Sequence, residues 1–421
     1  MSFLLLSLYL FCTFIRPQEW APGLMGKPLI NALAVSGFFF LCLEKLVSSK
    51  KGFIKVPHNG FMLGLYAATI LSHAAHTYVG GMTMAAKGFL VILILYFLVL
   101  NSIDSFIKYK VSTWWIVFLI CALVFQGMYQ VANGVGWAGQ YPITQGGKYT
   151  DLVTRITWVG IFSDPNDLAL TFVIAVGLVL PFIFGRTNFV SFGVSLICAG
   201  LLCYGVYLTN SRGGMLALMS TVYYFMVLRT GKLMVGGVIG SVIAAAILVL
   251  GPSRVGEIST AEASAYSRVE LWYQGFLMLK SNPLFGVGFN MFTDDLPQTA
   301  HNSYVLAFGE LGFFGFYMWM GLLYCTFKGL NAIQAKVPRL YNYTLGLQSG
   351  MVGFCAAGFF LSRTYVIIPY LIFSLTGALL HIARSIDPDF RFVLDKKDMG
   401  NIFWLSVGVI VLIFVTIKVA I

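Results

Sequence analysis

The sequence predicts an all-α polytopic membrane protein with about 12–13 transmembrane helices. Of its 421 residues, 58% are hydrophobic and only 10% are charged, whereas soluble domains carry about 25% charged residues. The mean hydropathy is +0.84. Lysine and arginine also gather in alternate loops between the hydrophobic stretches, which is typical of membrane proteins. These three observations argue against a soluble globular protein.

The hydrophobic stretches give the predicted helices in chain order, because a spanning helix needs roughly 20 apolar residues. They lie near residues 3–15, 29–46, 60–77, 83–101, 112–131, 166–184, 189–209, 213–229, 233–250, 303–327, 343–362, 364–384 and 402–420. The first stretch is short, so whether it crosses stays open. It has neither a basic start nor a small-residue cleavage site, so we expect a retained helix rather than a signal peptide. We expect one integral membrane domain over residues 1–421.

The basic residues predict the orientation of the chain. Sixteen of the 27 lysines and arginines fall in one set of alternate loops, which should be cytoplasmic. This set contains Lys45, Lys50, Lys51, Lys55, Lys108, Lys110, Arg186, Arg229, Lys232, Lys328, Lys336, Arg339, Arg384, Arg391, Lys396 and Lys397. The net charge of +11 therefore needs no nucleic-acid partner, although basic loops also attract anionic lipid heads.

Two longer segments are expected on the opposite, outer face. The first runs over about 132–165 and ends in an Asp-Pro-Asn sequence at 164–166. The second runs over about 251–302, and its residues 261–281 have the apolar spacing of an amphipathic helix. Pro283 should end that helix, since proline cannot continue one.

Cations at the outer face are the exception to the charge pattern and are candidate functional residues. The candidates are Arg155, Arg212, Arg254, Arg268, Lys280, His301 and Arg363. An arginine beside hydrocarbon is expensive and marks a functional site by default, and its planar guanidinium matches phosphate geometry. Alternatives remain for each residue, such as snorkelling at Arg212 or an ion pair between Arg268 and Glu270. As a group they indicate a site for a phosphate-bearing lipid.

Three of the candidate groups have distinct chemistry. Arg212 precedes Gly213 and Gly214, where glycines allow close backbone approach and a following helix could offer amides to an anion. Histidine side chains ordinarily titrate near neutrality, so His301 could take a proton from an attacking hydroxyl, or be a hydrogen-bonded interfacial histidine. Glu310 lies about two helical turns beyond His301. It could orient an arginine, relay a proton, or be a structural partner.

Metal and nucleotide sites have weak support. His73 and His76 are three residues apart, but no cysteine or carboxylate near them completes a ligand set. The aspartates at 164, 167, 294 and 295 are ordinary loop residues. All seven cysteines lie in apolar stretches and resemble small hydrophobic residues. The phosphate-binding loop of ATPases is absent from the sequence. We expect neither a metal nor another cofactor.

Five short motifs resemble one known family in content and order. They occupy residues 162–169, 211–218, 267–272, 282–288 and 300–304. Together they resemble the O-antigen ligase and Wzy-type O-antigen polymerase superfamily of bacterial envelope glycosyltransferases. The segment Ile15–Glu19, with its Arg-Pro-Gln sequence, is similar to some ligase-type members. The resemblance covers residues 160–312, and the other helices agree only in number and character.

The resemblance implies a GT-C-like fold and a metal-independent, inverting glycosyltransferase. It would act at the periplasmic face of the bacterial inner membrane, without a nucleotide sugar. The donor would be a glycan on undecaprenyl diphosphate, and the acceptor lipid A–core, another glycan or a protein. Membrane lipids would be its other partners.

The resemblance also implies residue roles. Arg212 and Arg268 would bind the diphosphate and stabilise the charge on the leaving group, with Arg155 as a third contact. His301 would orient or deprotonate the acceptor hydroxyl. The supporting residues would be Asn166, Asn302 and Glu310. Asp164 stands where many relatives have asparagine, and a thirteenth helix exceeds the usual ligase count.

Several functions stay open at this point. A ligase would transfer a finished glycan to lipid A–core, and a protein O-oligosaccharyltransferase would transfer it to protein. A Wzy-type polymerase would instead extend a lipid-linked chain. The Arg-Pro-Gln segment favours the ligase. A lipid-diphosphate transporter is the non-enzyme alternative, but transporters usually bind at the membrane midplane, whereas these cations are expected at the outer face. No sequence feature favours a non-catalytic assembly subunit.

Overall fold

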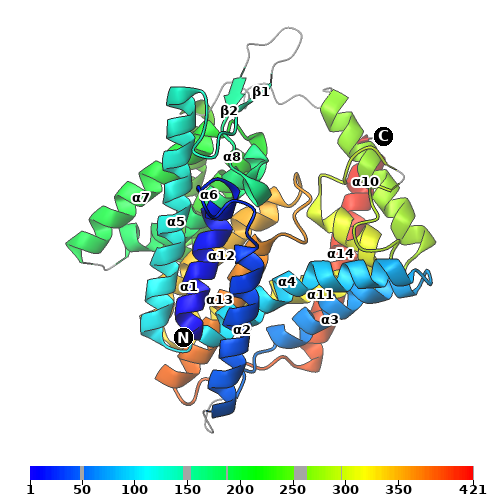
Figure 1. The fold of residues 1–421 in the computed structure, drawn as a ribbon, viewed down its shortest axis with the longest axis horizontal. Coiled ribbons are helices and arrows are strands. Elements are labelled where there is room, and N and C mark those ends of the chain that lie inside the picture. Colours follow the sequence, from blue (N-terminus) through cyan, green and yellow to red (C-terminus); the bar gives the residue numbers. More distant parts are fainter. Residues whose placement is uncertain (48–51, 146–152, 186–187, 251–262, 295, 421) are drawn as a thin grey trace. The chain divides into compact units, whose positions relative to one another are not determined.

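The computed structural model is built of helices, and each hydrophobic stretch predicted from the sequence forms one (Figure 1). It describes residues 1–47, 52–145, 153–185, 188–250, 263–294 and 296–420. Arg254, a candidate cation, and Asp295 lie outside the described residues, as do Lys50, Lys51 and Arg186. The chain divides into two compact units, each formed from three separated segments.

The first unit comprises residues Met1–Gly52, Asn101–Glu257 and Ile333–Ala357. Its helices are α1 (Ser2–Phe14), α2 (Leu29–Val47), α5 (Phe106–Asn133), α6 (Pro165–Phe184), α7 (Phe189–Leu208), α8 (Arg212–Thr230), α9 (Leu233–Leu250) and α12 (Tyr341–Ala357). Three-residue 3₁₀ turns are η1 (Pro17–Glu19), η2 (Gly160–Phe162) and η4 (Pro338–Leu340). The antiparallel strands β1 (Ile143–Gln145) and β2 (Val153–Arg155) form a ribbon that the sequence analysis did not predict.

Helix α6 lies at the centre of this unit, because α12, α7 and α8 all pack against it. Glycines permit the closest of these contacts. A Cβ on Gly177 of α6 would lie only 2.5 Å from the backbone nitrogen of Gly350 on α12. Small residues commonly let helix backbones approach each other in membranes. The sequence thus places its smallest residues where two helices meet.

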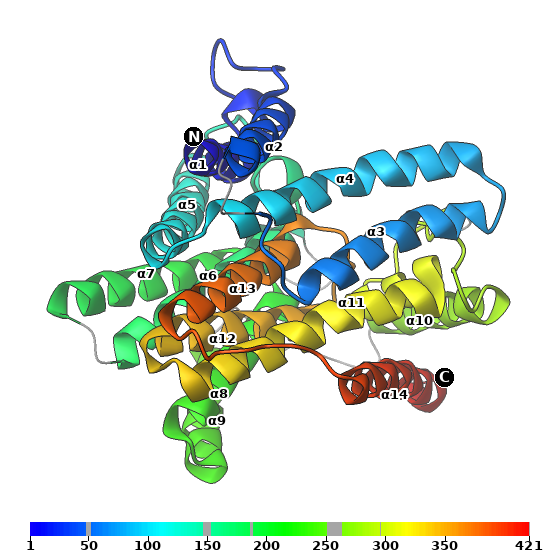
Figure 2. The same ribbon diagram turned by 90° about the horizontal axis from the view of Figure 1, so that it is seen from below.

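The second unit comprises Phe53–Leu100, Ile258–Ala332 and Gly358–Ile421. Its helices are α3 (His58–Ala74), α4 (Val79–Ser102), α10 (Ala263–Ser281), most of α11 (Ser303–Lys336), α13 (Ile367–Ile386) and α14 (Lys396–Ala420). Figure 2 shows α3 running between α4 and α11. An ion pair between Lys328 and Asp398 joins α11 to α14, and the Tyr324 hydroxyl donates to Asp398 at 2.8 Å.

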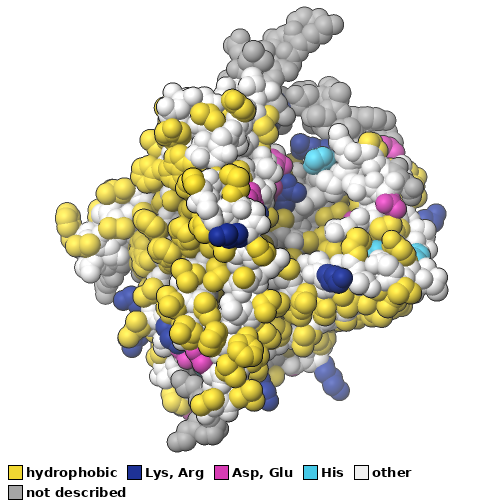
Figure 3. All heavy atoms as spheres, viewed as in Figure 1, with side chains coloured by type: hydrophobic (Ala, Val, Ile, Leu, Met, Phe, Trp, Pro, Cys, Tyr) yellow, Lys and Arg dark blue, Asp and Glu magenta, His cyan; other side chains and the backbone are white. Residues whose placement is uncertain are grey.

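The chain is a multi-pass membrane protein, as the sequence predicted. Within the described residues, eight helices are long and apolar enough to cross a membrane. They are α2, α4, α5, α6, α7, α11, α13 and α14, while α1 and the Leu233–Ile243 part of α9 are shorter apolar helices. The remaining predicted spans form α3, α8 and α12. Hydrophobic side chains are spread widely over the face seen in Figure 3. Phe189 and Trp404, for example, are 87% and 69% exposed, as expected of surfaces that face lipid.

Candidate functional site

The first unit gathers Arg155, Asn166 and the turn that carries Arg212. Arg155 ends β2 and is only 6% exposed. Its Nε donates to the Thr209 carbonyl at 2.9 Å, and its Nη2 donates to Asn166 Oδ1 at 2.9 Å. This buried guanidinium therefore joins the end of α7 to the start of α6.

Asn166 is the centre of this cluster. Its Oδ1 also accepts from the Ser211 hydroxyl at 2.7 Å, and its Nδ2 donates to Asp164 at 2.9 Å. Asp164 caps α6 by accepting from the Asn166 backbone amide. An aspartate at this position thus has a structural function of its own. Because donors and a carboxylate surround the Asn166 amide on both sides, its orientation is fixed.

Arg212 is the first residue of α8 and is half-buried. Ser211 caps the helix by accepting from the Gly214 amide at 3.0 Å. A Cβ on Gly214 would lie 2.5 Å from the Cβ of Ala169 on α6. Only glycine therefore lets α8 begin so close to α6. Before the cap, Asn210 takes a left-handed conformation, with φ 47°, and donates to the Thr154 carbonyl. The turn that carries Arg212 is thus attached to β2.

The Arg-Pro-Gln-Glu segment contacts the chain just before the Asp-Pro-Asn motif. Arg16 pairs with Glu19, and a Cβ on Gly160 would collide with the Arg16 guanidinium. The Trp158 indole donates to the Phe14 carbonyl at 2.9 Å. These contacts bring together two segments that are far apart in the sequence.

The second unit holds His301, Asn302, Glu310 and the helix that carries Arg268. His301 is half-buried in a left-handed turn with φ 48°. The Trp272 indole of α10 donates to the carbonyl of Ala300 at 3.1 Å. Arg268 is half-buried one helical turn before Trp272. Trp272 thus connects α10, which carries Arg268, to the turn that carries His301.

Asn302 caps α11 and is fully buried. Its Oδ1 accepts from the amides of Tyr304 at 2.9 Å and Val305 at 3.1 Å. Its Nδ2 has no hydrogen-bond partner within the described part of the chain. Helix capping explains the hydrogen bonds of the Asn302 side-chain oxygen. It does not explain the buried Nδ2 donor, which lies next to His301 in the chain.

Glu310 is 2% exposed and holds the loop between α10 and α11. Its Oε2 accepts from the Asn290 amide at 3.1 Å, and its Oε1 accepts from the Phe292 amide at 3.0 Å. Both oxygens therefore bind backbone, which favours the structural partner among the alternatives that the sequence left open.

The same loop runs along a break in α11. At Gly312 the helix leaves helical geometry, with φ 62° and ψ −168°. The Phe313 amide donates to the Pro283 carbonyl at 2.8 Å, and the Gly288 amide donates to the Glu310 carbonyl at 3.0 Å. The Asn-Pro-Leu-Phe-Gly-Val-Gly motif thus pairs its backbone with the interrupted helix.

His73, in the last turn of α3, and His76, in the turn that follows α3, both contact this loop, which the sequence did not predict. The ring Nε2 of His73 lies 3.0 Å from the Phe289 carbonyl, and that of His76 lies 2.9 Å from the Gly286 carbonyl. Their spacing of three residues was the signal available in the sequence. Their common target could not be identified from the sequence.

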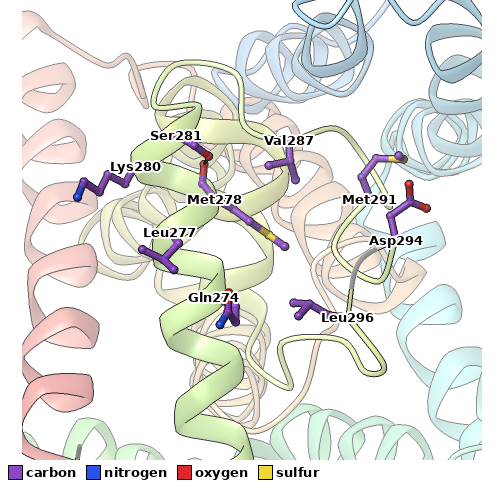
Figure 4. Close-up of a pocket in the computed structure, with 9 residues that line it drawn as sticks. All are labelled: Gln274, Leu277, Met278, Lys280, Ser281, Val287, Met291, Asp294 and Leu296. Atoms are coloured by element: carbon purple, nitrogen blue, oxygen red, sulfur yellow. Dashed lines mark hydrogen bonds between the residues drawn. The ribbon is translucent and has the colours of Figure 1, made fainter.

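A cavity of about 620 Å³ lies between α10 and the loop that follows it (Figure 4). In Figure 4 Met278 points from α10 toward the loop, whereas Lys280 points away. The lining residues are Gln274, Leu277, Met278, Lys280, Ser281, Val287, Met291, Asp294 and Leu296. The sequence predicted the helix but gave no indication of a cavity.

The predicted site residues fall into two groups, one in each unit. Arg155, Asn166 and Arg212 lie in the first unit, and Arg268, His301, Asn302 and Glu310 lie in the second. No cluster of three or more histidines, cysteines or carboxylates with the arrangement of a metal site occurs among the residues that the structure describes.

Comparison with known proteins identifies the central part of the chain. No curated protein matches the sequence. Residues 197–320, which include Arg212, Arg268 and His301, match a family model described as O-antigen ligase. This match covers less than half of the chain. It includes the motifs at 211–218, 267–272, 282–288 and 300–304, whereas the motif at 162–169 lies before it. The protein is therefore a multi-pass membrane protein with an O-antigen ligase (Wzy_C) domain, a domain shared by O-antigen ligases and polymerases.

Proposed function

We propose that this protein is a metal-independent, inverting glycosyltransferase that uses a glycan on undecaprenyl diphosphate. It acts at the periplasmic face of the bacterial inner membrane, as an O-antigen ligase with lipid A–core as acceptor. The observation that carries the proposal is the O-antigen ligase domain at residues 197–320. That domain contains the two arginines and the histidine that the chemistry requires.

The proposed reaction is a single displacement. The acceptor hydroxyl attacks the anomeric carbon while the bond from that carbon to the diphosphate oxygen breaks, and the configuration inverts. His301 takes the hydroxyl proton. Arg212 and Arg268 bind the diphosphate and stabilise the charge that develops on it. Because diphosphate is a good leaving group, positioned cations and one base suffice.

Arg155 has a more specific role in this proposal. Its Nε and Nη2 donate to Thr209 and Asn166, so the guanidinium stabilises the turn that precedes Arg212. We therefore propose that Arg155 positions the Arg212 turn, and a direct contact between Arg155 and the diphosphate stays a prediction.

The test uses purified protein, an undecaprenyl-diphosphate glycan and separate acceptors. Wild type should transfer the glycan to lipid A–core, and His301→Ala should lower the rate by about 10²- to 10⁴-fold, which is the usual contribution of a general base. Donor binding should persist in this variant. Transfer that His301→Ala leaves unchanged would remove His301 from the reaction.

The other acceptors and EDTA separate the alternatives. An elongated lipid-linked glycan would indicate a polymerase, and transfer to protein an oligosaccharyltransferase. Donor binding that depends on arginine, without product on any acceptor, would instead favour a transporter. Activity should survive EDTA. A strict metal requirement would contradict the proposed mechanism and direct attention to Asp164, Asp167 and Asp294.

A further inference from the structure

Three tryptophans of the first unit, Trp20, Trp137 and Trp158, form a tryptophan cluster outside the residues that match the family model. We propose that this cluster, with the buried glutamines around it, binds a sugar residue of the donor glycan. The inference rests on the proposed function, because it assigns the part of the donor that the arginines and the histidine do not bind.

Trp137 is the exposed member of the cluster. Its side chain is 38% exposed, whereas Trp158 is 1% exposed. The Trp158 ring meets those of Trp20 and Trp137 edge to face, with centroids 6.4 Å and 6.2 Å away. Gln140 closes the loop around Trp137, because its Oε1 accepts from the Ala138 amide at 3.1 Å. Trp137 is therefore fixed by its loop and by Trp158 while part of its side chain remains exposed.

Anchoring at the membrane surface does not explain the cluster. Tryptophans in that role place an apolar ring at the lipid headgroups and direct the indole N–H toward water. Here Trp158 Nε1 donates to the Phe14 carbonyl at 2.9 Å, and Trp20 Nε1 donates to the Ile15 carbonyl at 3.0 Å. These two indoles thus bind the end of α1 from both sides and support Trp137.

Side-chain amides surround Thr157, the residue before Trp158. Gln130 Oε1 accepts from the Thr157 amide at 2.8 Å, and Gln130 Nε2 donates to the Thr157 hydroxyl at 3.2 Å. Gln126 and Gln140 both donate from Nε2 to the Thr157 carbonyl, at 3.1 Å and 3.3 Å. A few fixed polar groups beside aromatic rings are the usual composition of a small-molecule site.

Two buried acceptors beside the cluster lack a donor. Oε1 of Gln126 and Oε1 of Gln18 have no hydrogen-bond partner in the part of the chain that the structure describes, and the two residues are 0% and 8% exposed. Their amide nitrogens already donate, to the carbonyls of Thr157 and Cys12, so each oxygen keeps its direction. Because buried polar groups are normally paired, two unpaired acceptors indicate a ligand that supplies donors.

The missing ligand must donate hydrogen bonds and present an apolar surface to an indole. An ionised phosphate or carboxylate does not fit, because these groups only accept hydrogen bonds. A pyranose carries hydroxyl donors around its edge and C–H groups on its faces, which can pack against a tryptophan ring. Its hydroxyls reach the glutamine oxygens directly or through one water. The chemistry of the cluster therefore favours a carbohydrate.

The cluster is joined to the turn that carries Arg212. The Asn210 side chain donates to the Thr154 carbonyl at 2.9 Å, and the Ile156 amide donates to the Leu208 carbonyl at 3.3 Å. Residues 154–158 thus connect that turn to Trp158. In the donor, the first sugar is bonded directly to the diphosphate that Arg212 binds in the proposed reaction. A sugar at the cluster and a diphosphate at Arg212 therefore fit one donor molecule.

The experiment measures the affinity of two probes, an undecaprenyl-diphosphate glycan and undecaprenyl diphosphate without glycan. Wild type should bind the first more tightly. Trp137→Ala should weaken binding of the glycan-bearing probe about tenfold, as expected for the loss of one aromatic contact, and leave binding of the bare diphosphate unchanged. Trp137→Phe keeps a ring and should recover most of the loss. Trp404→Ala is the control, because Trp404 on α14 is 69% exposed and should bind both probes as wild type.

The difference between the probes decides the proposal. Equal binding of both probes by wild type would overturn it, and so would an equal loss for both probes in Trp137→Ala, since a structural or membrane-anchoring residue behaves in this way. Failure of the proposed function gives a separate result. Wild type would then transfer glycan to no acceptor, while the two affinities would still test the tryptophan cluster.

Discussion

At the residue scale, two candidate arginines of the first unit have different surroundings. Arg155 is buried and donates to Thr209 and Asn166. Arg212 is half-buried at the start of α8, where its turn is held by Ser211 and Asn210. The Arg155 guanidinium holds the turn before α8 in place, whereas Arg212 is the first residue of the helix that begins at this turn.

Arg212→Lys should lower transfer by about tenfold or more while the protein still inserts into the membrane. A lysine keeps the charge but cannot form the two parallel hydrogen bonds of a guanidinium fork with phosphate. The measurement is the transfer rate at saturating acceptor, together with the yield of folded protein. Wild-type activity in Arg212→Ala would remove this residue from catalysis.

Asn166→Ala should destabilise the first unit by about 1–3 kcal/mol, because Arg155 and Ser211 would each lose a buried acceptor. Thermal unfolding in detergent measures the change. Asn133→Ala is the matched control, since that amide donates to the Tyr129 carbonyl at an exposed site. If both variants unfold at the same temperature, Asn166 does not organise the cluster.

At the element scale, the loop between α10 and α11 is the main structural feature that positions the second cluster. It is bound by Glu310 on α11, by Ser72 and His73 on α3, and by His76 in the turn that follows α3. Tyr365 lies in the segment between α12 and α13. Burial raises the pKa of its hydroxyl well above the usual range for tyrosine, and the negative charge of Glu310 is a further cause. The Tyr365 hydroxyl therefore stays protonated near neutral pH.

Glu310→Gln should lower stability and transfer together. The amide nitrogen would face a backbone N–H that the carboxylate now accepts, so one buried donor would lose its acceptor, at a cost of about 1–3 kcal/mol. Glu270→Gln is the control, because Glu270 is exposed on α10 and accepts only from Gln274 in the described structure. A Glu310→Gln protein with wild-type unfolding but altered pH dependence of transfer would indicate proton relay instead.

The helices could be predicted from the sequence, whereas the contacts between them could not. Hydrophobic length is a local property, so α6 and α9 begin within one residue of their predicted positions. The break at Gly312 depends on pairing with residues 283–288, and the bond between Ser303 and Arg363 joins residues 60 apart. Such long-range contacts leave no periodic signal in the chain.

The residues of the candidate site could likewise be chosen from the sequence, whereas the contacts between them could not. Arg212, Arg268 and His301 could be chosen because cations at the expected outer face break the charge pattern. Arg363 was among those cations, but its position beside the histidine turn became visible only in the structure. The supporting role of Asn166 was predicted from the motif, and its bonds to Arg155 and Ser211 were not.

At the scale of the whole molecule, the distribution of charge predicts the orientation in the membrane. Basic residues near Arg384 to Lys397 should lie in the cytoplasm, and the segment that carries Arg268 and His301 should lie outside. Gln298 and Asp389 are both exposed and belong to these two regions. They are therefore suitable positions for a direct measurement of sidedness.

Gln298→Cys should react with a membrane-impermeant maleimide in intact spheroplasts, whereas Asp389→Cys should react only after the membrane is permeabilised. Wild type supplies the background from its own cysteines, of which Cys203 is exposed in the structure. The opposite labelling pattern would place His301 on the cytoplasmic side, where a lipid-linked glycan already exported to the periplasm could not reach it. Because the reaction needs the donor diphosphate and His301 on one face, this pattern would contradict the proposed ligase even if Arg212 and Arg268 bind phosphate.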